Sequence, residues 1–198
     1  PEAPETEDIP FDKVGYSKVG SAKDLQGWID AIYERGYVAV DTETTSLNEM
    51  TAELVGISLC VEPGEACYIP LTHKAQASDD LFGSDDLAEG QMATDDALAL
   101  LKPMLEDDSI LKIGQNMKYD LKIFAQIGIN VISIEDTMLM SYAMHGGLHG
   151  DGMEGLSERY MNQTPIQIKS LLGSGKSAIT FDKVGLEEAV PYAAEDAD

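Results

Sequence analysis

Residues 37–44 read YVAVDTET, a short apolar run that ends in two acids. The β-branched and aromatic residues of the run are typical of a strand. Residues two apart on a strand point to the same face, so Asp41 and Glu43 can reach one cation. Two carboxylates held away from water require a cation or a raised pKa. The stretch therefore predicts a strand with two metal ligands; the alternative is a pair of acids that caps a turn in water.

Two later segments carry acids that can complete such a site. Asp120 closes GQNMKYD at residues 114–120, where a helix pattern begins, and an acid there is also favourable simply because of the helix dipole. Tyr192 and Asp196 stand four apart in YAAEDAD, a spacing that places both on one helix face. If the three segments converge, their four carboxylates can hold two divalent cations, the arrangement that suits phosphodiester hydrolysis.

The order of the remaining patterns predicts a mixed α/β sheet of about five strands with helices on its faces. Three antiparallel strands are followed by alternating helices and strands and then by helices alone. Residues 72–92 are polar and acidic and predict an exposed loop. The expected strands are 37–42, 54–61, 66–71, 110–113 and 131–134, and the expected helices include 22–35, 94–106, 117–127, one capped by Asp136, 156–161 and one from Leu186.

The formal net charge of −23 bears on the partners of the chain. Affinity for duplex nucleic acid rests on Lys and Arg side chains that neutralise phosphates, so a chain this acidic is not a typical nucleic-acid binder. Most of these charges are expected to form a solubilising surface. Any contact with nucleic acid must then be local, helped by bound metal, or assisted by a partner domain.

Length and composition indicate one globular domain. The chain has 198 residues, of which 43% are hydrophobic. We expect no membrane span, because no apolar run approaches the roughly 20 residues that a bilayer requires. The chain shows no secretory signal pattern, so a cytoplasmic location is expected. Cys60 and Cys67 are expected to be buried reduced thiols, with a bridge across a hairpin as the alternative.

The three acidic segments resemble the Exo I, Exo II and Exo III motifs of the 3′–5′ proofreading exonucleases in bacterial family A DNA polymerases, the DNA polymerase I type. DTETTSL at residues 41–47 resembles the first motif and GQNMKYD the second, and YAAEDAD resembles the third nearly letter for letter. The similarity extends from about residue 15 to the end of the chain. It includes the segments between the motifs at 62–64, 100–103, 136–139 and 186–189.

The resemblance implies an RNase H-like fold and two-metal hydrolysis of the 3′-terminal phosphodiester of single-stranded or frayed DNA, releasing nucleoside 5′-monophosphates. The implied cations are two Mg²⁺, or Mn²⁺, with Zn²⁺ as an alternative at the tighter site. By this analogy Asp41, Glu43 and Asp196 hold the cation that presents the attacking water. Asp41 shares a second cation, which Asp120 supports through its waters, and Tyr192 orients the attacking water.

The resemblance also implies contacts with the DNA 3′ end. Leu47 is expected to wedge against the terminal base and Phe181 to pack against the end nucleotide. Thr42, Gln115 and Asn116 are expected to contact nucleic acid around the site. The implied partner in the parent chain is a polymerase domain, and the domain itself is expected to be a bacterial monomer.

The expected domain organisation is a linker or disordered arm at residues 1–14 and an exonuclease domain at 15–198, whose last helix is expected to continue past the end of this sequence. Other functions also remain open. The chain can be a stand-alone RNA-trimming exonuclease of the same type, or a degenerate scaffold that binds DNA without catalysis. A third alternative is an acidic interaction module whose carboxylates merely chelate.

Overall fold

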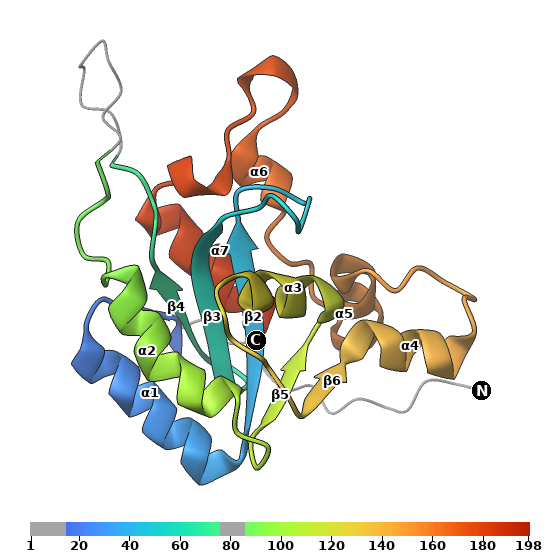
Figure 1. Ribbon diagram of the computed structural model, residues 1–198. Coiled ribbons are helices and arrows are strands. Elements are labelled where there is room, and N and C mark those ends of the chain that lie inside the picture. The colour runs from blue at the N-terminus through green and yellow to red at the C-terminus, as the bar shows by residue number, and fades with distance from the viewer. Residues whose placement is uncertain (1–14, 76–85) are drawn as a thin grey trace.

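A computed structural model describes residues 15–75 and 86–198 of the chain. It contains a six-stranded sheet in the order β1-β4-β3-β2-β5-β6 (Figure 1). β3 runs antiparallel to β2 and β4, and the other neighbours are parallel. The mixed sheet confirms the expected fold class, with one strand more than expected. The strands are β1 (Ser17–Lys18), β2 (Tyr37–Thr44), β3 (Leu54–Glu62), β4 (Glu65–Pro70), β5 (Leu111–Gly114) and β6 (Ile134–Asp136).

Helices cover both faces of this sheet. Figure 1 shows α1 and α2 in front of the sheet and α7 behind it. No helix within the described ranges combines the length and the apolar character that a bilayer-spanning segment needs. The helices are α1 (Ala22–Arg35), α2 (Thr94–Leu105), α3 (Lys118–Gln126), α4 (Thr137–His145), α5 (Met153–Met161), α6 (Ile168–Leu172) and α7 (Leu186–Ala197), with short 3-10 turns η2 (Gly175–Ser177) and η3 (Phe181–Lys183).

The alternation of side chains along β2 decides which face the acids occupy. Val38 and Val40 are buried in the core that α1 and α2 cover. Ala39 packs on the opposite face, against a cluster that includes residues of α7. Because strand residues two apart share a face, Asp41 and Glu43 continue the Ala39 side of the strand. The two acids therefore point toward α7.

Local signals explain most element boundaries. The Ser21 hydroxyl caps α1 by accepting a hydrogen bond from the Asp24 N–H at 3.2 Å, and Gly36 ends the helix with φ of 80°. The expected helix at 22–35 is thereby confirmed. β6 was expected from Val131 but begins at Ile134, because Ser133 has φ of 53°, a left-handed conformation that interrupts an extended strand.

The segment expected to be an exposed loop is partly buried. His73 is fully buried and Met92 is 8% exposed, so both ends of residues 72–92 pack into the protein. The middle of this segment, residues 76–85, lies outside the described residues. The expected arm at residues 1–14 lies outside them as well.

The two cysteines are free and buried, as expected. Cys60 is opposite Ala66, and Cys67 is opposite Leu59. The two thiols therefore occupy neighbouring register positions and point to opposite faces of the sheet, where Cys67 joins the core under α1 and Cys60 the core under α7. This alternation explains why the hairpin does not carry a disulfide.

A paired glycine substitution tests how tightly β3 packs against β4. A Cβ at Gly56 would lie 2.2 Å from the Tyr68 hydroxyl, and Tyr68 is fully buried. We expect Gly56→Ala to lower the free energy of unfolding by about 1–3 kcal/mol through overpacking. Gly27→Ala is the matched control, because Gly27 lies in α1 with no atom within 4 Å of an added Cβ; it should stabilise by roughly 0.5–1 kcal/mol. Urea unfolding that gave both variants the same sign would contradict this packing.

Candidate active site

Three carboxylates from two distant segments meet on the face of the sheet beneath α7. Asp41 and Glu43 extend from β2, and Asp196 extends from the last turns of α7. One oxygen of each carboxylate lies within 4.8 Å of the oxygens of the other two. Oxygen atoms at such separations can ligate one hard divalent cation. The structure thus brings together three of the predicted metal ligands.

The electrostatics of this group favour a bound cation. Burial raises the pKa of Asp41 to about 6 and that of Asp196 to about 8, in the latter case with a further contribution from the Asp41 charge. The pKa of Glu43 is raised well above its usual value, first by burial and then by Asp41 and Asp196. Within the described residues, Glu43 Oε1 is buried without a hydrogen-bond partner. A cation among these oxygens would relieve both the repulsion and the missing bond, so the donor set fits a divalent metal ion.

Asp120 flanks this group without joining it. Its Oδ1 accepts hydrogen bonds from the Thr42 N–H at 3.1 Å and the Thr42 hydroxyl at 2.5 Å. Burial, and then the charge of Asp41, raises the pKa of Asp120 to about 7. The acid from α3 is thereby fixed beside the strand position between Asp41 and Glu43. Thr42 was expected to contact nucleic acid, but its hydroxyl is buried and holds Asp120, a role that sequence reasoning missed.

The turn before α3 is held by a carboxylate outside the metal site. Asn116 has φ of 59°, a left-handed conformation, and its N–H donates to Asp136 Oδ1 at 3.1 Å. The same oxygen caps α4 by accepting from the Met138 N–H at 2.9 Å. Sequence reasoning predicted Asp136 as a helix cap only. The structure shows that it also fixes the entry into the helix that carries Asp120.

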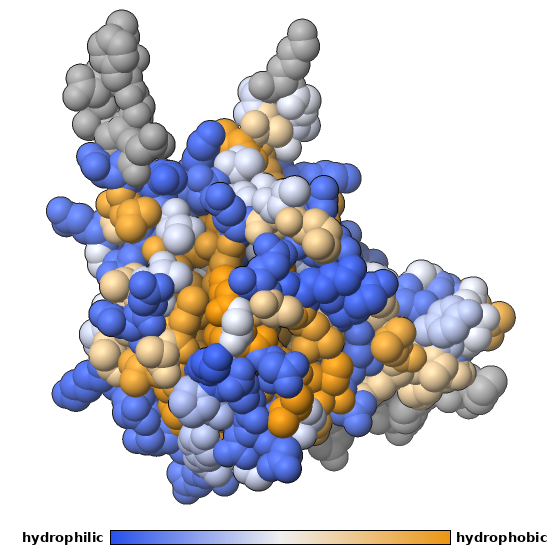
Figure 2. All heavy atoms as spheres, in the orientation of Figure 1, coloured by the Kyte–Doolittle hydropathy of each residue, from blue (hydrophilic) through white to orange (hydrophobic). Residues whose placement is uncertain are grey.

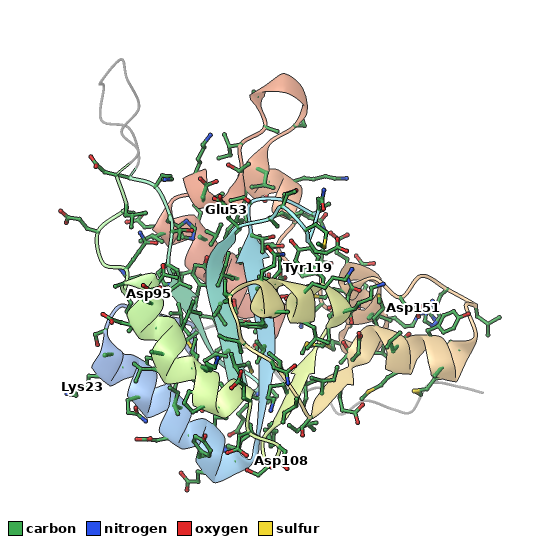
Figure 3. All side chains as sticks on the ribbon, viewed as in Figure 1. Lys23, Glu53, Asp95, Asp108, Tyr119 and Asp151 are labelled. Atoms are coloured by element: carbon green, nitrogen blue, oxygen red, sulfur yellow. The ribbon has the colours of Figure 1, made fainter. Side chains whose placement is uncertain are left out.

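Gln115 is half-buried and both ends of its amide are engaged. Its Nε2 donates to the Asp151 carbonyl at 2.7 Å, and its Oε1 accepts from the Thr137 hydroxyl at 2.5 Å. Asp151, labelled in Figure 3, in turn accepts from the Ser141 hydroxyl of α4 at 2.7 Å. Gln115 therefore connects the glycine-rich segment at residues 146–155 to the edge of the candidate site.

A cavity of about 1070 Å³ opens beside the acidic group. Its wall includes Asp196, Gln115 and Arg159 of α5. The remaining lining is mostly apolar, and α4 and α5 both contribute to it. Figure 2 shows apolar residues along α4. The cavity thus combines acidic side chains and one arginine with a largely apolar lining.

The loop after β2 carries Leu47 outward. Leu47 is 94% exposed. The Tyr119 hydroxyl donates to the Ser46 carbonyl at 2.5 Å and shares a hydrogen bond of 2.5 Å with the Thr44 hydroxyl. Figure 3 shows Tyr119 on α3 next to this loop. α3 therefore supports the loop from below and leaves the Leu47 side chain free.

Tyr192 lies one turn before Asp196 on α7 and is 9% exposed. Burial, followed by the neighbouring Asp196 carboxylate, raises the pKa of Tyr192. Its hydroxyl thus keeps its proton at neutral pH and can act as a hydrogen-bond donor. Phe181 was expected to pack against a nucleotide, but it is 2% exposed and its ring lies 5.7 Å from the Tyr192 ring. In this structure the Phe181 ring therefore packs inside the protein, against Tyr192.

Glu195 of α7 and Asp198, the residue that follows the helix, serve the fold. Glu195 Oε2 accepts from the Ile166 N–H at 2.6 Å. Asp198 accepts from the Gly64 N–H at 2.7 Å and from the Tyr16 hydroxyl at 2.8 Å. These bonds attach the helix to the connection before α6 and to the β3–β4 turn. They fix the position of α7, and with it the position of Asp196.

Comparisons with known proteins extend these observations. The model of the DNA polymerase A 3′–5′ exonuclease family matches residues 16–198. DNA polymerase I of Rhizobium leguminosarum is 44% identical over 199 residues, covering 96% of this chain and 19% of that protein. DNA polymerase I of Pseudomonas aeruginosa is 35% identical over 190 residues, covering 94% of this chain and 20% of that protein. The chain thus spans about a fifth of the length of these relatives.

Solved structures share the fold at low sequence identity. Escherichia coli RNase D has a TM-score of 0.62 and 20% identity, with 92% of this chain and 41% of that chain covered. Brucella melitensis NrnC with bound Mg²⁺ has a TM-score of 0.56 and 22% identity, with 84% and 68% covered. These likenesses confirm the expected RNase H-like fold.

The raised pKa values predict how stability depends on pH in the absence of metal. An acid whose pKa is higher in the folded state contributes stability below its unfolded pKa, near 4, and loses it as pH rises through the folded value. The Tm measured in a chelator is therefore expected to decrease as the pH is raised from about 4 to about 8. Asp41, Asp120 and Asp196 set this range.

Asp120→Asn isolates one member of this group, because asparagine keeps the Oδ1 acceptor for Thr42 and removes the charge. Each pKa unit corresponds to about 1.4 kcal/mol, so a rise of the Asp120 pKa from 3.8 to about 7 means that the variant should recover on the order of 4 kcal/mol at pH 8 and little at pH 4. Thermal melting of both proteins in EDTA across this range provides the measurement. Parallel curves for the two proteins would show that Asp120 is not destabilised in the folded state.

Proposed function

Because the chain belongs to the 3′–5′ exonuclease family found in DNA polymerase I, we propose that it removes nucleotides one at a time from the 3′ end of single-stranded or frayed DNA. Water attacks the terminal phosphorus, the bond from phosphorus to the 3′ oxygen breaks, and a nucleoside 5′-monophosphate leaves. The shortened strand keeps a free 3′ hydroxyl. This chemistry would remove a mispaired end and so serve proofreading.

One observation carries the proposal. Acids from the second strand and the last helix place three carboxylate oxygens within 4.8 Å of one another, with Asp120 fixed alongside by Thr42. A fold without a ligand for these acids would gain nothing from their burial, because buried like charges destabilise the folded state. The arrangement is what phosphodiester hydrolysis with two divalent cations requires.

We propose that Asp41, Glu43 and Asp196 hold one divalent cation and that Asp41 shares a second, which Asp120 supports through its waters. Mg²⁺ or Mn²⁺ suits an all-oxygen donor set, and Zn²⁺ is an alternative at the tighter site. When bound, the two cations would lower the pKa of the attacking water and stabilise charge on the leaving 3′ oxygen. Chelation should accordingly abolish activity.

The remaining residues would orient the reactants. The Tyr192 hydroxyl, which keeps its proton, would hydrogen-bond the attacking water one helical turn from Asp196. Leu47, exposed on its supported loop, would wedge against the terminal base. Gln115 and Asn116 would line the path of the strand, and the cavity beside Asp196 would receive the terminal nucleotide. Apolar and stacking contacts accept every base, as removal of any mispaired end requires.

The acidity of the chain also fits a role within a larger protein. The formal net charge of −23 disfavours duplex binding by this domain alone. We propose that residues 15–198 form one exonuclease domain, to which a polymerase domain of the same parent chain delivers the DNA 3′ end. Bound cations would supply the local positive charge at the scissile phosphate.

The test is incubation with a 5′-labelled DNA primer that carries a 3′ mismatch, in Mg²⁺. A ladder of products shortened from the 3′ end, absent in EDTA, is the expected result. A matched RNA oligomer distinguishes an RNA-trimming enzyme, which would degrade RNA faster than DNA. Intact primer and intact RNA with bound metal would indicate a scaffold without catalysis.

Asp41→Asn is expected to reduce the single-turnover rate at least a hundredfold, because Asp41 is proposed to contact both cations. The fold should survive, since the substitution relieves repulsion among buried acids. Glu187→Gln is the matched control: it removes one exposed acid from the first turn of α7 and should leave the rate within twofold of the unmodified chain. Equal rates for Asp41→Asn and its control would exclude the proposed site.

A further inference from the structure

The rings of Tyr68, His73, Phe181 and Tyr192 form one continuous buried cluster. The Phe181 ring lies 5.7 Å from the Tyr192 ring, 6.5 Å from the Tyr68 ring and 5.6 Å from the His73 ring. Tyr68 and His73 are fully buried, and Phe181 is 2% exposed. Tyr192 is the member of this cluster whose hydroxyl interacts directly with the Asp196 carboxylate.

His73 joins this cluster to the start of α7. Its Nδ1 lies 3.0 Å from the Val184 carbonyl, which can only accept, so Nδ1 carries the proton. Nε2 then accepts from the Tyr68 hydroxyl at 2.8 Å. The Gln91 side-chain amide holds the His73 backbone through two hydrogen bonds. Its Oε1 accepts from the His73 N–H at 2.8 Å, and its Nε2 donates to the His73 carbonyl at 2.9 Å.

The position of these bonds along the chain is what matters for Tyr192. Val184 lies between η3, which contains Phe181, and the first residue of α7 at Leu186. The Lys74 N–H also donates to the Asp182 carbonyl at 2.7 Å. The segment after β4 therefore holds η3 and the N-terminal end of α7 in one place relative to the sheet. Phe181 transmits this placement to the Tyr192 ring by direct contact.

We propose that Phe181, backed by Tyr68 and His73, is a positioning residue that fixes the Tyr192 ring so that its hydroxyl meets the attacking water. The inference rests on the proposed exonuclease function and on the role given there to Tyr192. Phe181 touches neither the carboxylates nor the substrate in this assignment. It acts through Tyr192, and its effect on the reaction exists only while the Tyr192 hydroxyl is present.

A double-mutant cycle tests this dependence. Phe181→Leu removes the ring and keeps an apolar side chain, and Tyr192→Phe removes the hydroxyl and keeps the ring. The measured quantity is the single-turnover rate at saturating oligonucleotide and Mg²⁺, with KM and the Mg²⁺ concentration for half-maximal rate determined in parallel. Ile32→Val, in the core under α1, controls for general loss of stability.

Phe181→Leu is expected to slow the unmodified enzyme about tenfold, since a displaced catalytic group forfeits much of its contribution. KM and the Mg²⁺ requirement should not change. In the Tyr192→Phe background the same substitution should change the rate less than twofold, because the two residues act as one unit. Ile32→Val should leave the rate unchanged.

A tenfold loss in both backgrounds would overturn the inference, because it would show that Phe181 acts independently of the Tyr192 hydroxyl. If Tyr192→Phe alone left the rate unchanged, the role of Tyr192 and this inference would fall together. The exonuclease assignment would survive that result provided that Asp41→Asn remained inactive. Should Phe181→Leu fail to fold, Phe181→Met fills the same space without a ring and carries the same expectations.

Discussion

The repulsion among Asp41, Glu43 and Asp196 is the energetic cost that the rest of the fold must overcome. Asp41 and Glu43 come from β2 and Asp196 from α7, and they meet because α7 packs on the face of the sheet to which alternate residues of β2 point. Apolar contacts between α7 and the sheet must outweigh the cost of the buried charges, a cost that a bound cation would remove. The site is therefore an unstable element that a stable frame holds together.

The surrounding structure buries these acids and also fixes their positions through hydrogen bonds. Asp198 and Glu195 attach the C-terminal part of α7 through hydrogen bonds from backbone N–H groups. Thr42, which lies between the two acids of β2, attaches Asp120 of α3 to the strand. Each of these bonds joins segments that are far apart in the sequence. These polar groups near the acids thus orient the helix and the strand.

The regular pattern of the sequence was sufficient to predict what depends on local periodicity. The alternation in residues 37–44 and the helical spacing of Tyr192 and Asp196 predicted which side chains share a face. The meeting of these faces is a tertiary event, and only the resemblance of the three motifs to a known family indicated it. Thr42 and Phe181 show the limit: a sequence does not reveal whether a hydroxyl is already used by Asp120 or a ring is already buried. The sequence also contained no signal for the burial of His73 within an acidic segment or for the start of β6 after Ser133, because neither follows from local periodicity.

The cavity wall near Asp196 is rich in methionine, with Met140, Met144, Met153 and Met161 all lining it. Unbranched thioether side chains adopt many conformations at low cost, so in the proposed enzyme this wall would accommodate either a purine or a pyrimidine. The same sulfur atoms can be oxidised, and a sulfoxide would replace a flexible apolar side chain by a polar one. In the proposed enzyme, tolerance toward the base would therefore rest on side chains that oxidation can modify.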